Sequence, residues 1–152
     1  MNKTNKTISA IETIDPRTCL NVKIRRLARM STHIYERELK VFGLRSSQIG
    51  ILFMVGKKGS SNQKEVANFL FIDQSTMSRD LTMLTKKNLI QVSKGEDARH
   101  SQLMLTNRGY KLLEDLVPAW KQVHDKIETA LGSYSISAID LITGALMENT
   151  KR

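Results

Sequence analysis

The sequence predicts a mainly α-helical chain that carries one small β-hairpin. Apolar residues recur every three or four positions through long segments at both ends, which is the spacing of a helix face. Between residues 62 and 88, two short helical patterns flank a tight turn, the layout of a helix-turn-helix. After Asn88 the apolar spacing changes to two, as in strands. The expected order of elements is α-α-α-α-β-β-α-α.

Length and composition fit one globular domain, since the chain has 152 residues of which 40% are hydrophobic. No apolar run approaches the roughly 20 residues of a membrane-spanning helix. The polar N-terminus, MNKTNKTISAIE, lacks the apolar segment of a secretory signal. One cysteine allows no intrachain disulfide. We therefore expect a cytoplasmic protein without a membrane partner.

The net charge of +9 is unevenly distributed. Residues 1–45 contain ten Lys or Arg against four Asp or Glu, and residues 46–111 contain ten against five. Residues 112–152 contain four against six, so the C-terminal segment is mildly acidic. A basic excess over the first helix and the helix-turn-helix favours a polyanionic partner such as nucleic acid.

Helix-start signals divide the first part of the chain. Asp15 as N-cap and Pro16 at the first helical position predict a helix that runs to about residue 40. Ser46 is the expected cap of the second helix, which ends in the glycine-containing segment 56–59. The first helix is longer than a small nucleic-acid-binding unit requires, which suggests that it has a second role in dimer contact.

The next two helices form the predicted helix-turn-helix. Asn62 and Glu65 have the spacing of a capping box at the start of the third helix. Its expected buried residues are Val66, Ala67, Phe69 and Leu70. Asp73 is the expected cap of the fourth helix, whose inward positions are Met77, Leu81 and Leu84.

A hairpin and two more helices complete the chain. The alternating residues are Ile90 and Val92 in one strand and Leu103 and Leu105 in the other, with the polar KGEDARH between them. Thr106 is the expected cap of a long fifth helix. Pro118 should kink this helix or open one of its backbone hydrogen bonds, and Gly132 should end it. A last helix is expected to start at Ser135 or Ser137.

The exposed side of the fourth helix is the candidate DNA-reading surface. The N-terminal part of a second helix-turn-helix helix enters the major groove. Small hydroxyl side chains can bond phosphates or base edges, and an arginine can bond guanine O6 and N7 together. The candidate residues are Gln74, Ser75, Thr76, Ser78 and Arg79 in this helix, and Lys94, Asp97 and Arg99 in the hairpin wing. In the wing, Arg99 could enter a minor groove while Asp97 orients it.

These segments resemble the MarR family of bacterial winged-helix transcriptional regulators. The resemblance spans roughly residues 18–147 and is carried by QKEVANFL, DQSTMSRDLTMLTKKNLI, GEDARHSQLMLTNRGYKLL and PAWKQV. It implies a homodimeric regulator, a repressor by expectation, on pseudo-palindromic double-stranded DNA. Recognition helices would enter major grooves about 34 Å apart, with wings in the flanking minor grooves. By position, Ser75, Thr76, Ser78 and Arg79 take the recognition role, and Asp97 and Arg99 the wing role.

The resemblance also implies a division of labour along the chain. Residues 1–14 are expected to be a flexible extension and residues 15–152 a single MarR-like domain. Within it, residues 15–42 and 107–152 would form the dimerisation helices and residues 44–106 the DNA-binding part. A small-molecule effector of aromatic or phenolic type would bind between the dimerisation helices and the reading head, and an oxidant is the alternative signal.

Cys19 is the candidate redox sensor. It occupies the place where thiol-based hydroperoxide repressors of the family carry their reactive cysteine, although Lys23 stands one turn on and the tyrosines of those relatives do not match. A lone helix cysteine is more often a small buried apolar residue.

Two other function classes remain open. One is a non-specific nucleic-acid or RNA-binding winged helix, favoured by charge alone. The other is a thiol enzyme using Cys19, although no second cysteine is present to resolve it. We expect no enzyme activity, no cofactor and no metal, because His33, His100 and His124 lack metal-ligand spacing.

Overall fold

The computed structural model of the chain is mainly helical with a three-stranded antiparallel sheet, which confirms the predicted winged helix-turn-helix fold class. It describes residues 11, 14–94 and 101–150. In chain order the elements are α2 (Leu20–Glu38), the 3₁₀-helix η1 (Lys40–Phe42), α3 (Ser46–Lys58), β1 (Ser61–Asn62), α4 (Gln63–Leu70), α5 (Gln74–Lys86), β2 (Ile90–Lys94), β3 (Ser101–Leu105) and α6 (Asn107–Thr150).

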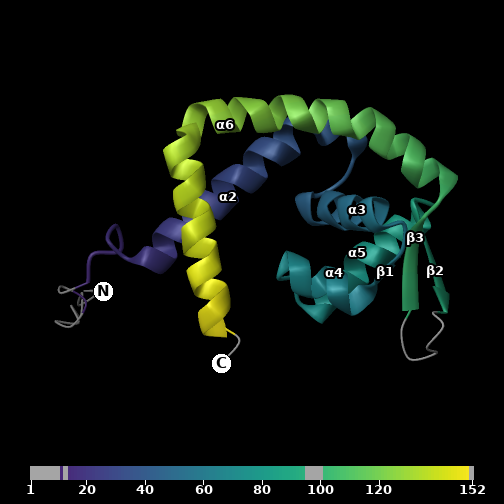
Figure 1. Ribbon diagram of the computed structural model, residues 1–152, viewed down its shortest axis with the longest axis horizontal. Coiled ribbons are helices and arrows are strands. Elements are labelled where there is room, and N and C mark those ends of the chain that lie inside the picture. The colour runs from purple at the N-terminus through teal and green to yellow at the C-terminus, as the bar shows by residue number, and fades with distance from the viewer. Residues whose placement is uncertain (1–10, 12–13, 95–100, 151–152) are drawn as a thin grey trace, which may run out of the picture.

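Figure 1 shows a compact head, made of α3, α4, α5 and the sheet, and two long helices that extend beyond it. α6 starts beside the sheet, passes over α3 and then bends sharply. The bend lies at Gly132 (φ 73°, ψ 158°), a backbone conformation that is essentially restricted to glycine. Pro118 keeps helical dihedral angles, so the predicted kink is at Gly132 instead. The last helical segment starts directly after Gly132 rather than at Ser135 or Ser137.

The hydrophobic core lies inside the head, where the three helices pack on the sheet. Its fully buried members include Leu52, Val66, Met77, Leu84 and Leu103. They take the inward positions that helix and strand periodicity assign to them. Burial of each such side chain contributes about 1.5–3 kcal/mol, so the core holds α5 firmly against the rest of the head.

The predicted start of the first helix is wrong. α2 begins at Leu20, with Cys19 in the N-cap position. Asp15 belongs to a separate turn, where its carboxylate accepts bonds from the Arg17 N–H (2.9 Å) and Nε (3.0 Å). The Asp-Pro pair therefore closes a turn before the helix, because Arg17 occupies the carboxylate that would have capped it.

The predicted cap of the second helix is also wrong. Ser46 is the first residue of α3, and Arg45 occupies the N-cap position. The Arg45 N–H donates to Oε1 of Gln48 (3.1 Å), and the Ser46 N–H donates to Oε1 of Glu36 on α2 (3.0 Å). A carboxylate from another element thus satisfies this helix end, a tertiary contact that the local sequence does not reveal.

The α4 cap is confirmed in part. Oδ1 of Asn62 accepts a hydrogen bond from the Lys64 N–H (2.7 Å). Glu65, the expected partner in a capping box, instead forms an ion pair with Lys58 (3.5 Å). Phe69 is 67% exposed, although we expect it on the buried side. Each residue turns a helix by about 100°, which carries Phe69 away from the buried stripe of this short helix.

The predicted hairpin is confirmed, and the sheet has one strand more. β2 and β3 pair antiparallel from Ile90 opposite Leu105 to Lys94 opposite Ser101. β1 adds to the other side of β3, with Ser61 opposite Leu103. A strand of two residues is too short to show an alternating pattern, so the sequence does not predict it.

The two long helices leave apolar side chains exposed, as the apolar stripes at both chain ends suggest. The exposed residues include Leu20, Leu27, Ile142 and Leu146, of which Leu20 is 65% and Leu146 50% exposed. By length and composition α6 could even cross a membrane, because it contains an 18-residue window of mean hydropathy 1.3 that is not buried. The expectation that no such run exists is therefore wrong. A bent helix whose apolar side packs against another subunit would have the same composition as a membrane-spanning helix.

Candidate nucleic-acid interface

A tight turn joins α4 to α5 and sets the direction of α5. Phe71 ends α4 in the left-handed conformation (φ 51°, ψ 40°), which is uncommon for a bulky residue. The Ile72 N–H donates back to the Ala67 carbonyl (3.1 Å), so the turn is closed by the backbone of α4 itself. The helix-turn-helix predicted for residues 62–88 is confirmed.

α5 turns one face to the core and the other to solvent. Met77, Leu81 and Leu84 form the buried face, as predicted. The five predicted contact residues lie in the first two turns: Gln74, Ser75, Ser78 and Arg79 are exposed, and Thr76 is half-buried. The head therefore presents them together, at the N-terminal end of a rigid helix.

Asp73 organises the first turn of α5, as its predicted role as N-cap requires. Its carboxylate accepts bonds from the Ser75 hydroxyl (2.5 Å), the Thr76 N–H (2.9 Å) and the Thr76 hydroxyl (2.7 Å). The hydrogen bond from the Ser75 side chain, followed by those from Thr76, lowers the pKa of Asp73 well below its ordinary value of 3.8. These bonds orient the hydroxyls of Ser75 and Thr76.

Arg79 lies over this capped turn. Its Nε donates to the Ser75 carbonyl (3.1 Å), and Nη2 lies 3.3 Å from the Thr76 hydroxyl and 3.4 Å from the Ser75 hydroxyl. All of these partners are neutral, so its charge is not cancelled by them. The guanidinium and the hydroxyls form one exposed cluster in which the cation can exchange these bonds for phosphate or base contacts.

The Asp73 network predicts an acid-dependent contribution to stability. Because folding lowers the pKa of Asp73, its carboxylate stabilises the folded chain above its ordinary pKa of 3.8, and this stabilisation is lost as pH falls below that value. We expect Asp73→Asn to lower Tm at neutral pH, and the difference from wild type to shrink towards about pH 2.5. Circular dichroism melts across this range measure it, with Asp115→Asn as the exposed control. Parallel Tm profiles would contradict the assignment.

A buried carboxylate fastens α5 to α3. Asp80 is only 5% exposed and accepts bonds from the Ser47 hydroxyl (2.6 Å) and from Nε2 of Gln48 (3.0 Å). Sequence reasoning missed this residue, although a charged side chain three positions after Met77 lies on the inward stripe. That exception to the apolar pattern was the available signal.

Two further cations lie beside the α5 surface. Arg45, at the start of α3, and Lys87, after α5, line a surface hollow of about 480 Å³ together with Ser78, Arg79 and other residues of α5. Nζ of Lys87 donates to the Gly43 carbonyl (2.7 Å), which fixes its position. Sequence reasoning did not select Arg45, because only the fold brings the start of α3 next to α5. It did not select Lys87 either, although Lys87 directly follows α5 in the sequence.

The wing is described in its strands and not at its tip. Lys94 is the last residue of β2. Asp97 and Arg99 lie outside the described residues, so their role in the minor groove stays a prediction. Figure 1 shows β2 and β3 side by side at one end of the head, where β2 contacts α5.

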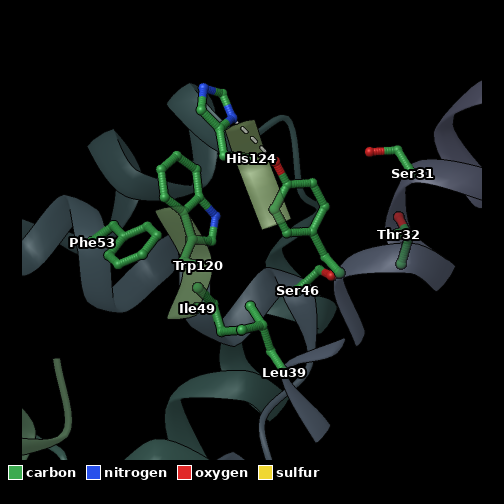
Figure 2. Close-up of a pocket in the computed structure, with 10 residues that line it drawn as sticks. Ser31, Thr32, Leu39, Ser46, Ile49, Phe53, Trp120 and His124 are labelled. Carbon is green, nitrogen blue, oxygen red and sulfur yellow. Dashed lines mark hydrogen bonds between the residues drawn. The ribbon is translucent and has the colours of Figure 1, made fainter. Parts of the chain in front are cut away.

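A second site, which we call the aromatic cavity, lies between α2, α3 and α6 (Figure 2). Its volume is about 380 Å³. Its aromatic lining comes from Tyr35, Phe53, Trp120 and His124, and its hydroxyl lining from Ser31, Thr32 and Ser46; Leu39, Ile49 and Gly50 complete it. The Trp120 and His124 rings are stacked with centroids 4.6 Å apart, and Phe53 meets Trp120 edge-on at 5.4 Å.

A hydrogen-bond chain runs along one side of this cavity. The Tyr35 hydroxyl lies 3.2 Å from Nδ1 of His124, and Nε2 of His124 lies 3.1 Å from Glu128. Burial, and secondarily the nearby Glu128 charge, raises the pKa of Tyr35, so its phenol stays protonated and can donate to His124. Trp120, His124 and Glu128 are spaced by four on α6, which was the sequence signal for this row.

Cys19 lies at the N-cap position of α2 and is half-buried. Within the described part of the chain, no hydrogen bond reaches its sulfur. Of the histidines, His33 is exposed on α2 and His124 belongs to the aromatic cavity. Among described residues, no group of three or more His, Cys, Asp or Glu side chains is placed to hold a metal ion.

Comparisons with known proteins agree with this geometry. The sequence profile of the MarR family matches residues 44–101. The uncharacterized HTH-type transcriptional regulator YwoH of Bacillus subtilis (strain 168) is 30% identical over 94 residues, 62% of this chain and 69% of YwoH. The M. tuberculosis transcriptional regulator MosR, solved in complex with DNA, is 26% identical with a TM-score of 0.75, over 88% of this chain and 98% of MosR. Bordetella bronchiseptica BpsR has a TM-score of 0.77 at 21% identity, over 89% of this chain and 98% of BpsR.

Proposed function

Because the chain belongs to the MarR family of transcriptional regulators, we propose that it is a homodimeric repressor whose α5 helices read a pseudo-palindromic operator. The observation that carries this proposal is the exposed cluster of hydroxyls and Arg79 in the first two turns of α5, held by the Asp73 cap and by buried Asp80. A reading surface must be rigid and accessible at once, and this cluster is both. The related MosR forms a complex with DNA, which supports the same partner here.

Within this proposal each candidate residue has a stated role. Ser75, Thr76, Ser78 and Arg79 contact bases and phosphates in the major groove, together with Gln74. Lys94, Asp97 and Arg99 place the wing in the adjacent minor groove. Arg45 and Lys87 add phosphate contacts beside the helix, because they line a hollow that is continuous with its exposed face.

The dimer is proposed to form through the regions 15–42 and 107–152. The support is the apolar surface on α2 and on the C-terminal half of α6, which nothing within the described chain covers. A symmetric dimer would bury these stripes and hold two heads at a fixed separation. A membrane could also cover these stripes. We favour a second subunit in a cytoplasmic protein, because the cationic head has to reach DNA.

The effector is proposed to be a small molecule bound in the aromatic cavity. The cavity touches both long helices and α3, so a ligand there is placed to change the angle between the head and the dimer helices. A ligand that favours a spacing of the two heads unsuited to DNA would shift the population away from binding. BpsR provides a precedent, since its DNA binding is regulated by 6-hydroxynicotinic acid.

Oxidation of Cys19 is kept as the alternative signal. Cys19 is half-buried and is not among the residues that line the aromatic cavity. A thiol sensor needs a group that stabilises the thiolate, and the described residues provide no hydrogen bond to it. Retention of a peroxide response by a Cys19→Ser variant would remove this alternative.

Arg79→Ala tests sequence-specific reading. We expect the variant to lose about 1–3 kcal/mol of discrimination between operator and random DNA, because a bidentate arginine–guanine contact carries that much specificity. The measurement is fluorescence anisotropy on a fragment selected from genomic DNA and on a shuffled copy, at fixed salt. Lys86→Ala, a cation at the other end of α5, is the matched control and should weaken both DNAs alike.

The same experiment separates the competing class. A non-specific nucleic-acid or RNA-binding protein loses affinity equally for every sequence when Arg79 is removed. Equal losses on the selected and shuffled fragments would therefore contradict the proposed function. So would wild-type protein that binds the two fragments with the same affinity at physiological salt.

A further inference from the structure

We infer that the aromatic cavity selects uncharged aromatic ligands that carry a hydroxyl or an amide group, and that it discriminates against the corresponding carboxylates. The inference deepens the proposed function, because it names the chemical class of the effector. It depends on which side chains line the cavity and on which of their polar atoms are still free.

The size and shape of the cavity fit a small planar ring system. Its volume of about 380 Å³ lies at the lower end of the range for ligand sites, roughly 300–1,000 Å³. Figure 2 shows the Phe53 and Trp120 rings beside each other in this cavity, and Tyr35 lines the same space. Ring faces and edges of this kind attract an aromatic ligand, and the apolar floor of Leu39 and Ile49 excludes water from its other side.

The charges around the cavity disfavour an anion. Among the described lining residues there is no lysine and no arginine. The two carboxylates bonded to lining groups, Glu128 on His124 and Glu36 on the Ser46 N–H, are both negative. A ligand carboxylate would thus lose water without gaining a counter-ion, and it would be repelled by these groups.

His124 does not change this conclusion. Its Nε2 is paired with Glu128, and its Nδ1 is bonded to the Tyr35 hydroxyl. Both ring nitrogens are therefore occupied by protein groups before a ligand arrives.

The free polar atoms require a neutral ligand with hydrogen-bonding groups. The Ser46 hydroxyl oxygen has almost no exposed surface, and among the described residues it has no hydrogen-bond partner. A buried hydroxyl without a partner is unfavourable, so a ligand gains by bonding to it once a small shift of the cavity wall brings the oxygen within reach. Across the cavity, the Tyr35 oxygen can still accept a bond while it donates to His124, and Figure 2 shows the Ser31 and Thr32 hydroxyls on the α2 side.

Matched acid and amide pairs provide the test. We would compare 6-hydroxynicotinic acid with 6-hydroxynicotinamide, and 4-hydroxybenzoate with 4-hydroxybenzamide, since the members of each pair share one ring system and differ only in having a carboxylate or a neutral amide group. Trp120 is the only tryptophan of the chain, so quenching of its fluorescence in the full-length protein reports occupancy of the cavity. Calorimetry checks each Kd independently. We expect each amide to bind about tenfold or more tightly than its acid.

Two variants tie the preference to the named groups. Ser46→Ala should weaken amide binding about fivefold, because the orphan hydroxyl is removed while the Ser46 backbone bond to Glu36 remains. Ser133→Ala, an exposed serine outside the cavity, is its control. Thr32→Arg should reverse the preference towards the acids by supplying a cation at the rim, whereas Thr32→Gln should not.

The outcomes separate this inference from the proposed function. Equal or tighter binding of the acids to wild type would overturn the inference, as would saturable binding of neither member of a pair. In both cases the operator binding of the protein, measured by anisotropy in parallel, would be unaffected. Conversely, selective amide binding by a protein that recognises no operator would uphold the ligand class and reject the regulatory role.

Discussion

Gly109→Ala is expected to destabilise the folded chain by about 3 kcal/mol or more. A Cβ at Gly109 would lie 2.2 Å from the Leu89 carbonyl oxygen and 3.3 Å from a Leu105 side-chain carbon. The carbonyl cannot move aside, since it accepts the Thr106 N–H bond (3.1 Å) that joins α6 to the end of the α5 segment. The Thr106 hydroxyl accepts the Gly109 N–H (3.0 Å) and fixes the glycine as well.

Urea unfolding at one protomer concentration measures this effect. Gly144→Ala is the control, because a Cβ there meets nothing within 4 Å and alanine is the better helix former by up to about 1 kcal/mol. The two alanine variants should therefore move the unfolding midpoint in opposite directions, or Gly144→Ala should leave it unchanged. A Gly109→Ala midpoint equal to that of wild type would show that the α6 start can shift away from Leu89.

Asp80→Asn is expected to destabilise the fold by about 2 kcal/mol, because bonds from neutral donors to a buried charged acceptor contribute about 1.5–3 kcal/mol each. The carboxylate accepts from both Ser47 and Gln48. An asparagine amide can still accept from Gln48 through its oxygen and donate to the Ser47 hydroxyl through its NH₂, so the loss comes from replacing two hydrogen bonds to a charged acceptor by weaker neutral ones. The weaker bonds hold α5 less firmly on α3, so operator affinity should fall even at urea concentrations below the unfolding midpoint.

Urea unfolding and operator anisotropy on the same samples measure the two effects. Asp115→Asn, on the exposed surface of α6, removes the same charge outside the head and should change neither value by more than about 0.5 kcal/mol. An Asp80→Asn variant that unfolds and binds like wild type would contradict the role of Asp80 as the link between the two helices.

The reading helix could be predicted from local sequence. Its cap Asp73, its inward residues Met77, Leu81 and Leu84, and the exposure of Arg79 all follow from short-range rules, because a capped helix of regular period determines its own faces. The hairpin follows for the same reason.

What the sequence did not predict depends on contacts between distant segments. Asp15 fails as a cap because Arg17 takes its carboxylate, and Ser46 because Glu36 reaches its N–H from α2. β1 exists only as an addition to β3. Phe69 was misplaced because a helix of eight residues buries only a narrow stripe, and the sequence pattern alone does not show which apolar positions fall on that stripe.

The same distinction applies to the site. The α5 side chains share one helix and could be selected from spacing alone. Arg45 could not, since its relevance depends on α3 packing across α5. Asp80 and Lys87 belong to α5 or follow it directly, but their bonds to Gln48 and to the Gly43 carbonyl depend on distant segments. In the aromatic cavity, Tyr35 bonds to His124, which lies 89 positions away in the sequence. A single sequence can therefore predict the region in which such a cavity lies, but not the residues that line it.

The central claim is that a dimer presents two α5 reading surfaces at one helical repeat of DNA. Selection of bound fragments from a random DNA pool, combined with the mass of the complex in solution, tests it most directly. We expect an enriched inverted repeat, with half-site centres about 10 base pairs apart and two chains per site. A pool without any enriched motif, or a single half-site occupied by one chain, would contradict it.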